Sequence, residues 1–286
     1  MNYRHAFHAG NFADVQKHAV LAQILTYLCR KPAAFRVIDT HAGAGRYDLS
    51  SREADRSGEW RGGIERVWKL RVQGRTPSRF LKPYLDTVAA LNPGEELRIY
   101  PGSPLICAAF TRRQDRLIAC ELEPRSTALL SAALRGQRRA KVLAIDGWTA
   151  LGAYVPPPER RGLVLIDPPF EDPDEFVHLS AKLAGAYSKW PNGIYMVWYP
   201  IKQRKAPDGF AREVRRFAGA KMLRSELILH EAPRQGALAG SGLILINPPF
   251  TLEAELRVFL PALSEMLSPK GDARADMMTS APLPKD

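Results

Sequence analysis

The sequence predicts an α/β fold in which helices cover both faces of a mostly parallel sheet. Short apolar runs, typical of buried strands, alternate with longer segments of helical periodicity over most of the 286 residues. Acidic or glycine-containing turns follow several of these runs, and ligands of open parallel sheets bind beyond the carboxyl ends of the strands. Hydrophobic residues form 45% of the chain, which supports one large domain with an insertion or two smaller domains.

The first predicted elements are a helix, a strand and a glycine turn. Asn11 can cap a helix that runs to about Arg30. The apolar residues near one face of this helix are Val15, Ala19, Ile24 and Leu28. Residues 35–39 then predict a short strand, and the Ala-Gly-Ala-Gly sequence at 42–45 predicts a tight turn after it.

An insertion then interrupts the alternation. Residues 50–95 predict a basic helical subdomain, with helices near 63–71 and 78–91. A short extended segment is predicted at 97–100. Pro104 suits the first turn of the next helix, with Ser103 as its N-cap.

The remaining chain alternates regularly. Strands are predicted at 117–121, 141–145, 163–167, 194–198, 222–230 and 243–247, which together with 35–39 make a seven-stranded sheet. Helices are predicted at 125–134, 174–190, 210–217 and 252–267. We therefore expect one domain built from residues 1–49 and 96–267, with 50–95 inserted into it. Residues 268–286 are rich in Pro, Lys, Asp and small residues, and predict a mobile tail.

Charge and cysteine content limit the classes of partner. The formal net charge of +11 and the pI of about 9.7 predict attraction to a polyanion, most often a nucleic acid. The sequence has no apolar run of spanning length, no signal peptide and no lipidation motif, so we expect a cytoplasmic protein that binds no membrane. Cys29, Cys107 and Cys120 have no CxxC spacing, which favours reduced core thiols over a metal site. Nothing suggests a coiled coil, and we expect a monomer.

Much of the positive charge lies in the predicted insertion. From Trp60 to Pro83 there are seven basic residues and one acidic residue, with Trp60, Trp68, Phe80 and Tyr84 among or beside them. Basic and aromatic side chains together suit contacts with an RNA backbone and its bases. The alternative is a solvated helical face whose aromatic side chains form a small core. Further basic sets at 202–216 and 135–141 allow the same two interpretations.

The strongest chemical motif is Asp167-Pro168-Pro169-Phe170, which follows the apolar run 162–166. Asp167 can accept a hydrogen bond from an amine, and the prolines lack N–H donors and hold the nearby carbonyls in place. Phe170 offers a flat face to a planar base. This combination suits methylation of an exocyclic amino group such as adenine N6. The alternative is a strand that simply ends in a Pro-Pro turn.

Acidic residues at neighbouring strand ends indicate the cofactor. The glycine turn that contains Gly43 lacks the third glycine of a dinucleotide-binding motif, because position 48 is Asp48, and a carboxylate there disfavours a pyrophosphate. Glu121 and Asp146 end two later strands and can accept hydrogen bonds from ribose hydroxyls and an adenine amine. Gly147 permits close backbone approach. Carboxylates suit a cationic adenosine compound without phosphate, which is S-adenosylmethionine.

Two other patterns favour structural roles. Asn247-Pro248-Pro249-Phe250 also follows an apolar run, but on the last strand, long after the cofactor residues. In the class I methyltransferase fold that strand runs antiparallel, so we expect it to end away from the site. His5 and His8 have the spacing of a ligand pair, yet no third suitable ligand is near in sequence, so we expect no metal.

Three segments resemble one known family. They are the stretch Tyr3–Asn11 with the following Ala13–Val15 and Lys17–His18, the stretch Asp39–Tyr47, and the motif Asp167–Glu171. On these motifs the chain resembles the RlmJ-type bacterial 23S ribosomal RNA adenine-N6 methyltransferases. The resemblance covers the chain up to the last predicted helix. One departure is Phe170, where the family commonly has tyrosine, and ring stacking survives this change.

The resemblance implies a class I, Rossmann-like methyltransferase fold that binds S-adenosylmethionine and 23S ribosomal RNA. Carried over by position, the residues that bind the cofactor are His18, His41, Gly43, Ser103, Glu121, Asp146, Gly147 and Asp167. It further implies that Asp167, Pro168 and Phe170 are catalytic and that Tyr3 and Phe170 contact the RNA. His18 by itself would be interpreted as a hydrogen-bonded packing residue.

Three alternatives remain open from the residues. A DNA adenine-N6 methyltransferase shares the Pro-Pro motif. A non-catalytic RNA-binding protein on a methyltransferase scaffold would not need an intact Asp167 and glycine turn. A nucleotide-dependent oxidoreductase is opposed by Asp48 and by the Pro-Pro motif.

Overall fold

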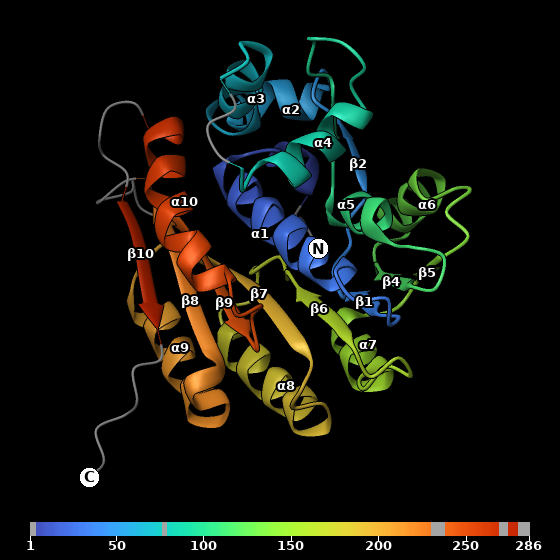
Figure 1. Ribbon diagram of the computed structural model, residues 1–286, viewed down its shortest axis with the longest axis vertical. Coiled ribbons are helices and arrows are strands. Elements are labelled where there is room, and N and C mark those ends of the chain that lie inside the picture. The colour runs from blue at the N-terminus through green and yellow to red at the C-terminus, as the bar shows by residue number, and fades with distance from the viewer. Residues whose placement is uncertain (1–3, 76–78, 230–237, 269–273, 280–286) are drawn as a thin grey trace.

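A sheet of eight strands forms the centre of the computed structural model, which describes residues 4–75, 79–229, 238–268 and 274–279. The strand order is β10-β8-β9-β7-β6-β1-β4-β5 (Figure 1). Their bounds are β1 Arg36–Asp39, β4 Arg116–Cys120, β5 Ala140–Leu143, β6 Gly162–Ile166, β7 Ile194–Ile201, β8 Met222–Ile228, β9 Gly240–Ile246 and β10 Arg274–Thr279. From β5 to β7 the strands are parallel, and β9 runs antiparallel to both of its neighbours. The predicted α/β class and the reversed last strand of the seven are confirmed.

The eighth strand corrects one expectation. Residues 268–286 predicted a mobile tail, but Arg274–Thr279 form β10 and pair antiparallel with β8. Residues 269–273 and 280–286 lie outside the described residues. Without β10, strand β8 would be an edge strand with a row of unpaired backbone groups. The amino-acid composition of residues 268–286 does not show that they can pair with β8, so the sequence did not indicate this strand.

Helices cover the two faces of the sheet (Figure 1). On one face lie α1 Phe12–Cys29, α5 Ser103–Phe110, α6 Pro124–Ala133 and α10 Leu252–Leu267; on the other lie α7 Gly147–Tyr154, α8 Glu175–Lys189 and α9 Lys205–Ala218. Side chains of β6 alternate between the two layers, because successive residues of a strand point to opposite faces. Leu163 and Leu165 pack under α1, whereas Val164 and Ile166 pack against the other helices.

The predicted insertion contains α2 Arg52–Ser57, α3 Ile64–Val72 and α4 Lys82–Ala90. Two short antiparallel strands, β2 Arg46–Asp48 and β3 Ile99–Pro101, bracket these helices, and β2 has no counterpart among the predicted strands. Short 3₁₀ helices occur at His5–Phe7, Glu59–Gly62 and Gly219–Lys221.

The aromatic residues of the insertion are mainly core residues. Trp68 and Tyr84 are buried, and Phe80 stacks on Phe259 of α10 with the ring centroids 4.1 Å apart. The structure therefore favours the small-core interpretation for these rings, while cations of the insertion such as Arg75 are exposed on its surface. In the described ranges, no helix is both long enough and apolar enough to cross a membrane.

Helix α1 carries several residues of the site described below, and its N-terminus is fixed by Asn11. The Asn11 side chain accepts a hydrogen bond from the backbone N–H of Asp14 at 3.0 Å, so the predicted cap is confirmed. Its amide also donates to Glu59 of the insertion at 3.0 Å. Asn11 thus links the start of α1 to the inserted subdomain.

We predict that Asn11→Ala lowers the free energy of unfolding by about 1–2 kcal/mol, because an N-cap bond and a cross-link to the insertion are lost. Urea denaturation of the variant and parent measures this. Ser51→Ala, which removes the longer cap bond of 3.3 Å at α2, serves as a control and should cost less. Equal stability of Asn11→Ala and the parent would contradict the prediction.

Candidate active site

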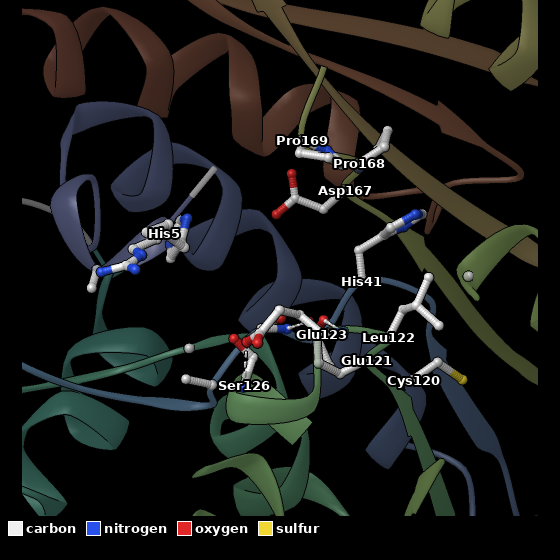
Figure 2. A pocket seen from close by; sticks show the side chains of 18 of the residues that line it. His5, His41, Cys120, Glu121, Leu122, Glu123, Ser126, Asp167, Pro168 and Pro169 are labelled. Atoms are coloured by element: carbon white, nitrogen blue, oxygen red, sulfur yellow. Dashed lines mark hydrogen bonds between the residues drawn. The ribbon is translucent and has the colours of Figure 1, made fainter. Parts of the chain in front are cut away.

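One cavity of about 590 Å³ opens at the carboxyl ends of β1, β4 and β6. Its size suits a nucleoside-sized ligand. Figure 2 shows Asp167 with Pro168 and Pro169 on one side of it, and Glu121 and Glu123 on the opposite side. The fold brings together in its lining nine of the residues that the sequence and the resemblance indicated: His18, His41, Gly43, Ser103, Glu121, Asp146, Gly147, Asp167 and Pro168.

Asp167 directly follows β6 and is held by a buried lysine of α1. The ammonium nitrogen of Lys17 lies 2.5 Å from Oδ2 of Asp167 and 2.8 Å from Oδ1 of Asp14. The Lys17 and Asp14 side chains are 4% and 2% exposed, and that of Asp167 is 15% exposed. Burial lowers the pKa of Lys17, but the carboxylates of Asp14 and Asp167 outweigh it, so the pKa lies above its ordinary value. Lys17 is therefore a fixed cation between two carboxylates.

Asp14 fixes the other end of this charge chain. Burial raises the pKa of Asp14, but the cation of Lys17 and the bond with His5 more than offset this, and the pKa lies well below its usual range. Asp14 also accepts a hydrogen bond from the Gly10 backbone at 2.8 Å and contacts Nε2 of His5 at 3.1 Å.

The sequence patterns assigned no site role to Lys17 or Asp14. A signal was nevertheless present, since these charged residues stand three apart in a helix whose other positions are mostly apolar. Their partner at position 167 follows 150 residues later and could not be identified from spacing.

The glycine turn positions Glu121 at the end of β4. Gly43 adopts a φ of +62°, and its N–H donates to Oε2 of Glu121 at 2.9 Å. The N–H of Glu123 donates to Oε1 at 2.8 Å. A Cβ at position 43 would approach the Tyr47 hydroxyl to 2.4 Å, which explains the need for glycine. The carboxylate is thereby oriented toward the cavity.

Asp146 and Gly147 begin helix α7. The Asp146 side chain caps the helix through Oδ2, which accepts from the Thr149 N–H at 2.8 Å and contacts its hydroxyl at 3.0 Å. Both bonds use the same oxygen, so Oδ1 is available as an acceptor. A Cβ at Gly147 would lie 2.3 Å from the Thr40 carbonyl, which confirms that close backbone approach requires glycine here.

His41 and His18 both line the cavity, in the neutral form. Burial lowers the pKa of His41 to about 4, and the ring packs edge-on against Trp148. Burial lowers the pKa of His18 to about 3. Nδ1 of His18 lies 2.7 Å from the Tyr100 hydroxyl, and the two rings stack. His18 is therefore a hydrogen-bonded packing residue that also lines the cavity.

Ser103 lies at the first turn of α5, where it was expected to act as an N-cap. Gly102 takes the N-cap position instead, and the Ser103 hydroxyl donates to Oδ2 of Asp39 at 2.7 Å. Asp39 is fully buried at the end of β1, and burial raises its pKa to about 7. Its Oδ1 is buried and has no hydrogen-bond partner among the described residues. The serine bonds to Asp39, which is 64 residues earlier in the chain, so the local sequence did not indicate this partner.

Phe170 does not line the cavity. It adopts a φ of +50°, and its ring packs against Phe176 and Trp198, with centroid distances of 4.8 and 5.8 Å. The ring that was predicted to stack on the target base is thus partly buried and packs against the core beside the motif, and its contact with the base stays a prediction. Tyr3, the other predicted RNA contact, lies outside the described residues.

The cavity also has an apolar rim that the sequence did not indicate. Leu122 and Leu129 line it and are 54% and 49% exposed. Exposed leucines beside a carboxylate provide an apolar surface for a planar ring. Leu122 directly follows Glu121, so the strand end supplies a polar and an apolar contact together.

The second Pro-Pro motif lies at the opposite end of the sheet from the cavity, as expected because β9 runs antiparallel to β6 and β7. The Asn247 amide donates to the carbonyls of Pro191 and Gly193 at 2.9 and 2.7 Å, which ties β9 to the turn after α8. In the described part of the chain, no group of three His, Cys, Asp or Glu side chains has the arrangement of a metal site.

Comparisons with known proteins agree with this geometry. A family model described as ribosomal RNA large subunit methyltransferase D, RlmJ, matches residues 32–279. The ribosomal RNA large subunit methyltransferase J of Escherichia coli is 40% identical over 283 residues, covering 99% of both chains. Its namesake from Haemophilus influenzae is 39% identical over 272 residues, covering 95% of both. A crystal structure of a Legionella pneumophila protein superposes with a TM-score of 0.89 and 34% identity, covering 96% of this chain and 99% of that one. This chain therefore belongs to the RlmJ family of large-subunit ribosomal RNA methyltransferases.

Proposed function

We propose that this protein transfers a methyl group from S-adenosylmethionine to the N6 amino group of an adenine in 23S ribosomal RNA. The observation that carries the proposal is the position of Asp167 and Pro168 at one wall of the cavity, with the carboxylate of Glu121 at the opposite wall. Membership of the methyltransferase family supports the reaction and favours it over the oxidoreductase and the non-catalytic alternatives.

The residues of the cavity fit S-adenosylmethionine. The carboxylates of the cavity can balance a sulfonium charge. His41 is neutral, so it adds no positive charge that would repel the sulfonium. Glu121 would accept from the ribose hydroxyls, Asp146 from the adenine amine, and Leu122 would contact the adenine ring. Gly43 and Gly147 leave room where a Cβ would collide with the protein. When bound, the cofactor supplies an activated methyl group.

The protein's own contribution is to position and polarise the target amine. Asp167 would accept one N6–H through Oδ1, because Oδ2 is held by Lys17, and the Pro168 carbonyl would accept the other. These bonds favour a nitrogen whose lone pair points out of the base plane, which makes it a better nucleophile. We attribute the rate enhancement mainly to orientation and electrostatics. The target base must be unpaired or flipped out, at a cost of roughly a few kcal/mol.

Two predicted RNA contacts have different support. Tyr3 remains a prediction, since it lies outside the described residues. For Phe170 we propose an indirect role, in which its packing on Phe176 and Trp198 fixes the turn that presents Asp167.

The overall reaction is tested by labelled methyl transfer to transcribed 23S ribosomal RNA and to duplex DNA, followed by nucleoside analysis. We expect N6-methyladenosine in the RNA alone. Label in DNA alone would favour the DNA methyltransferase alternative, and a failure to bind S-adenosylmethionine in calorimetry would favour the non-catalytic one.

We predict that Asp167→Ala lowers kcat by about 100-fold or more, because an acceptor that orients the amine is lost. Cofactor binding should remain measurable by calorimetry. Asn247→Ala in the second Pro-Pro motif is the matched control: it removes two hydrogen bonds at the far edge of the sheet and should lower Tm but not kcat. Near-parental turnover by Asp167→Ala would refute the mechanism.

We further predict that Lys17→Met lowers kcat by at least tenfold with a smaller change in cofactor affinity, since Asp167 loses the cation that positions it. Removing one partner of a buried pair should also destabilise the protein by roughly 3–5 kcal/mol. Single-turnover rates measured below the melting temperature separate the two effects, and Lys17→Arg should recover part of the rate. A loss of stability with an unchanged rate would leave Lys17 a purely structural residue.

A further inference from the structure

Arginines lie at the end of the sheet opposite the active site, where the parallel strands begin. Four neighbouring parallel strands, β6, β1, β4 and β5, each begin at an arginine or directly after one: Arg161, Arg36, Arg116 and Arg139. In the register of the sheet, Arg36 pairs with Arg116, and it also pairs with Gly162, next to Arg161. Leu117 pairs with Ala140, which brings Arg139 next to Arg116. Neighbouring strands lie about 4.8 Å apart, so the backbones of these four arginines lie close together where the strands begin.

Loops that are distant in sequence converge on these arginines. Arg112 donates to the carbonyl of Lys31 at 2.8 Å, and Arg161 donates to that of Ala33 at 2.9 Å. The guanidinium groups of Arg112 and Arg161 both lie over the Phe35 ring, with distances of 5.4 and 5.9 Å to its centroid. Hydrogen bonds and packing therefore hold these loops in one fixed surface.

We define the basal basic surface as the charged residues of segments 30–36, 112–116, 138–139 and 159–161. These segments contain ten basic and two acidic residues, a net charge of +8 in a chain whose total is +11. Both acids are already paired, Asp115 with Arg112 and Glu159 with Arg36. The other eight cations form no ion pair within the described ranges. Burial and the nearby charge of Arg112 lower the pKa of Arg161, as expected where cations crowd.

An exposed aromatic ring adjoins the basal basic surface. Phe250 of the second Pro-Pro motif is 81% exposed. Its ring packs edge-on against Tyr27, with the centroids 6.1 Å apart, and the Arg30 guanidinium lies 5.6 Å from the Tyr27 centroid. The amide nitrogen of Asn247 anchors the motif to the turn after α8, and Phe250 is the exposed residue of the motif.

We propose that the basal basic surface binds the phosphate backbone of RNA at a second site, separate from the catalytic cavity. Arginine forks match phosphate oxygens, and an exposed ring beside them suits an unpaired base. The inference rests on the proposed function for the identity of the RNA, which is the ribosomal RNA substrate itself. Strands β6, β1, β4 and β5 have four or five residues and span about 13–17 Å. An RNA that contacts both ends of the sheet must therefore extend well beyond the target base.

The test compares a long and a short substrate. Arg113→Glu, Arg116→Glu and Arg138→Glu are combined in one variant, because all three are exposed and lie far from the cavity. With full-length 23S transcript at 0.15 M salt, we expect KM to rise at least tenfold with kcat unchanged. A short RNA fragment that carries the unmodified target adenine should show parental kinetics. The salt dependence of transcript binding should weaken, since each lost phosphate contact removes about 0.7–0.9 from the log–log slope.

A control variant combines Lys182→Glu, Arg212→Glu and Arg216→Glu, which changes the net charge equally on the outer faces of α8 and α9. An unchanged KM in the basal variant, or an equal rise in the control, overturns the proposal. If the glutamate variant unfolds, glutamine at the same three positions provides the comparison. If the parent methylates no RNA, the proposed function fails, and filter binding of the transcript still decides whether the basal surface binds RNA.

Discussion

The buried chain of charges Asp14–Lys17–Asp167 is the interaction on which the site depends. It joins helix α1 to the end of β6 across 150 residues of sequence, with contacts of 2.8 and 2.5 Å. Buried charges are costly unless each is paired, so the three groups are stable only together. This constraint fixes the position of the carboxylate at the cavity wall, and it requires that α1 be correctly capped and packed before the site exists.

Because the central strands are parallel, the two ends of the sheet carry different types of side chain. Carboxyl ends of β1, β4 and β6 present acids and glycines to the cavity, whereas the amino ends of the same strands present arginines. The two Pro-Pro motifs follow the same rule. Asp167 directly follows the parallel strand β6 and lines the cavity, but Asn247 directly follows the antiparallel β9 and bonds to the turn after α8 at the opposite end of the sheet. Two similar motifs thus lie at opposite ends of the sheet because their strands run in opposite directions.

The sequence by itself determined the fold class and the acidic residues at one end of the sheet, whereas His18, His41 and Ser103 entered only through the family resemblance. Alternating strand and helix periodicity is a local property, and acids at successive parallel strand ends must meet at one edge of the sheet. For this reason the order of the strands along the chain was enough to group Glu121, Asp146 and Asp167, whereas the reversed direction of β9 was expected from the resemblance to the class I methyltransferase fold. The N-cap at Asn11 was equally predictable, because capping involves only neighbouring residues.

The tertiary structure alone decided which side chains pair across long distances. It pairs Asp167 with Lys17, packs the partly buried Phe170 ring against Trp198, and pairs β10 with β8 where a mobile tail was expected. It also gathered four separate basic segments into one surface that no single stretch of sequence contains. The physical reason is common to all four: the partners are remote in sequence, and their contacts depend on register, packing and burial, which local patterns do not encode.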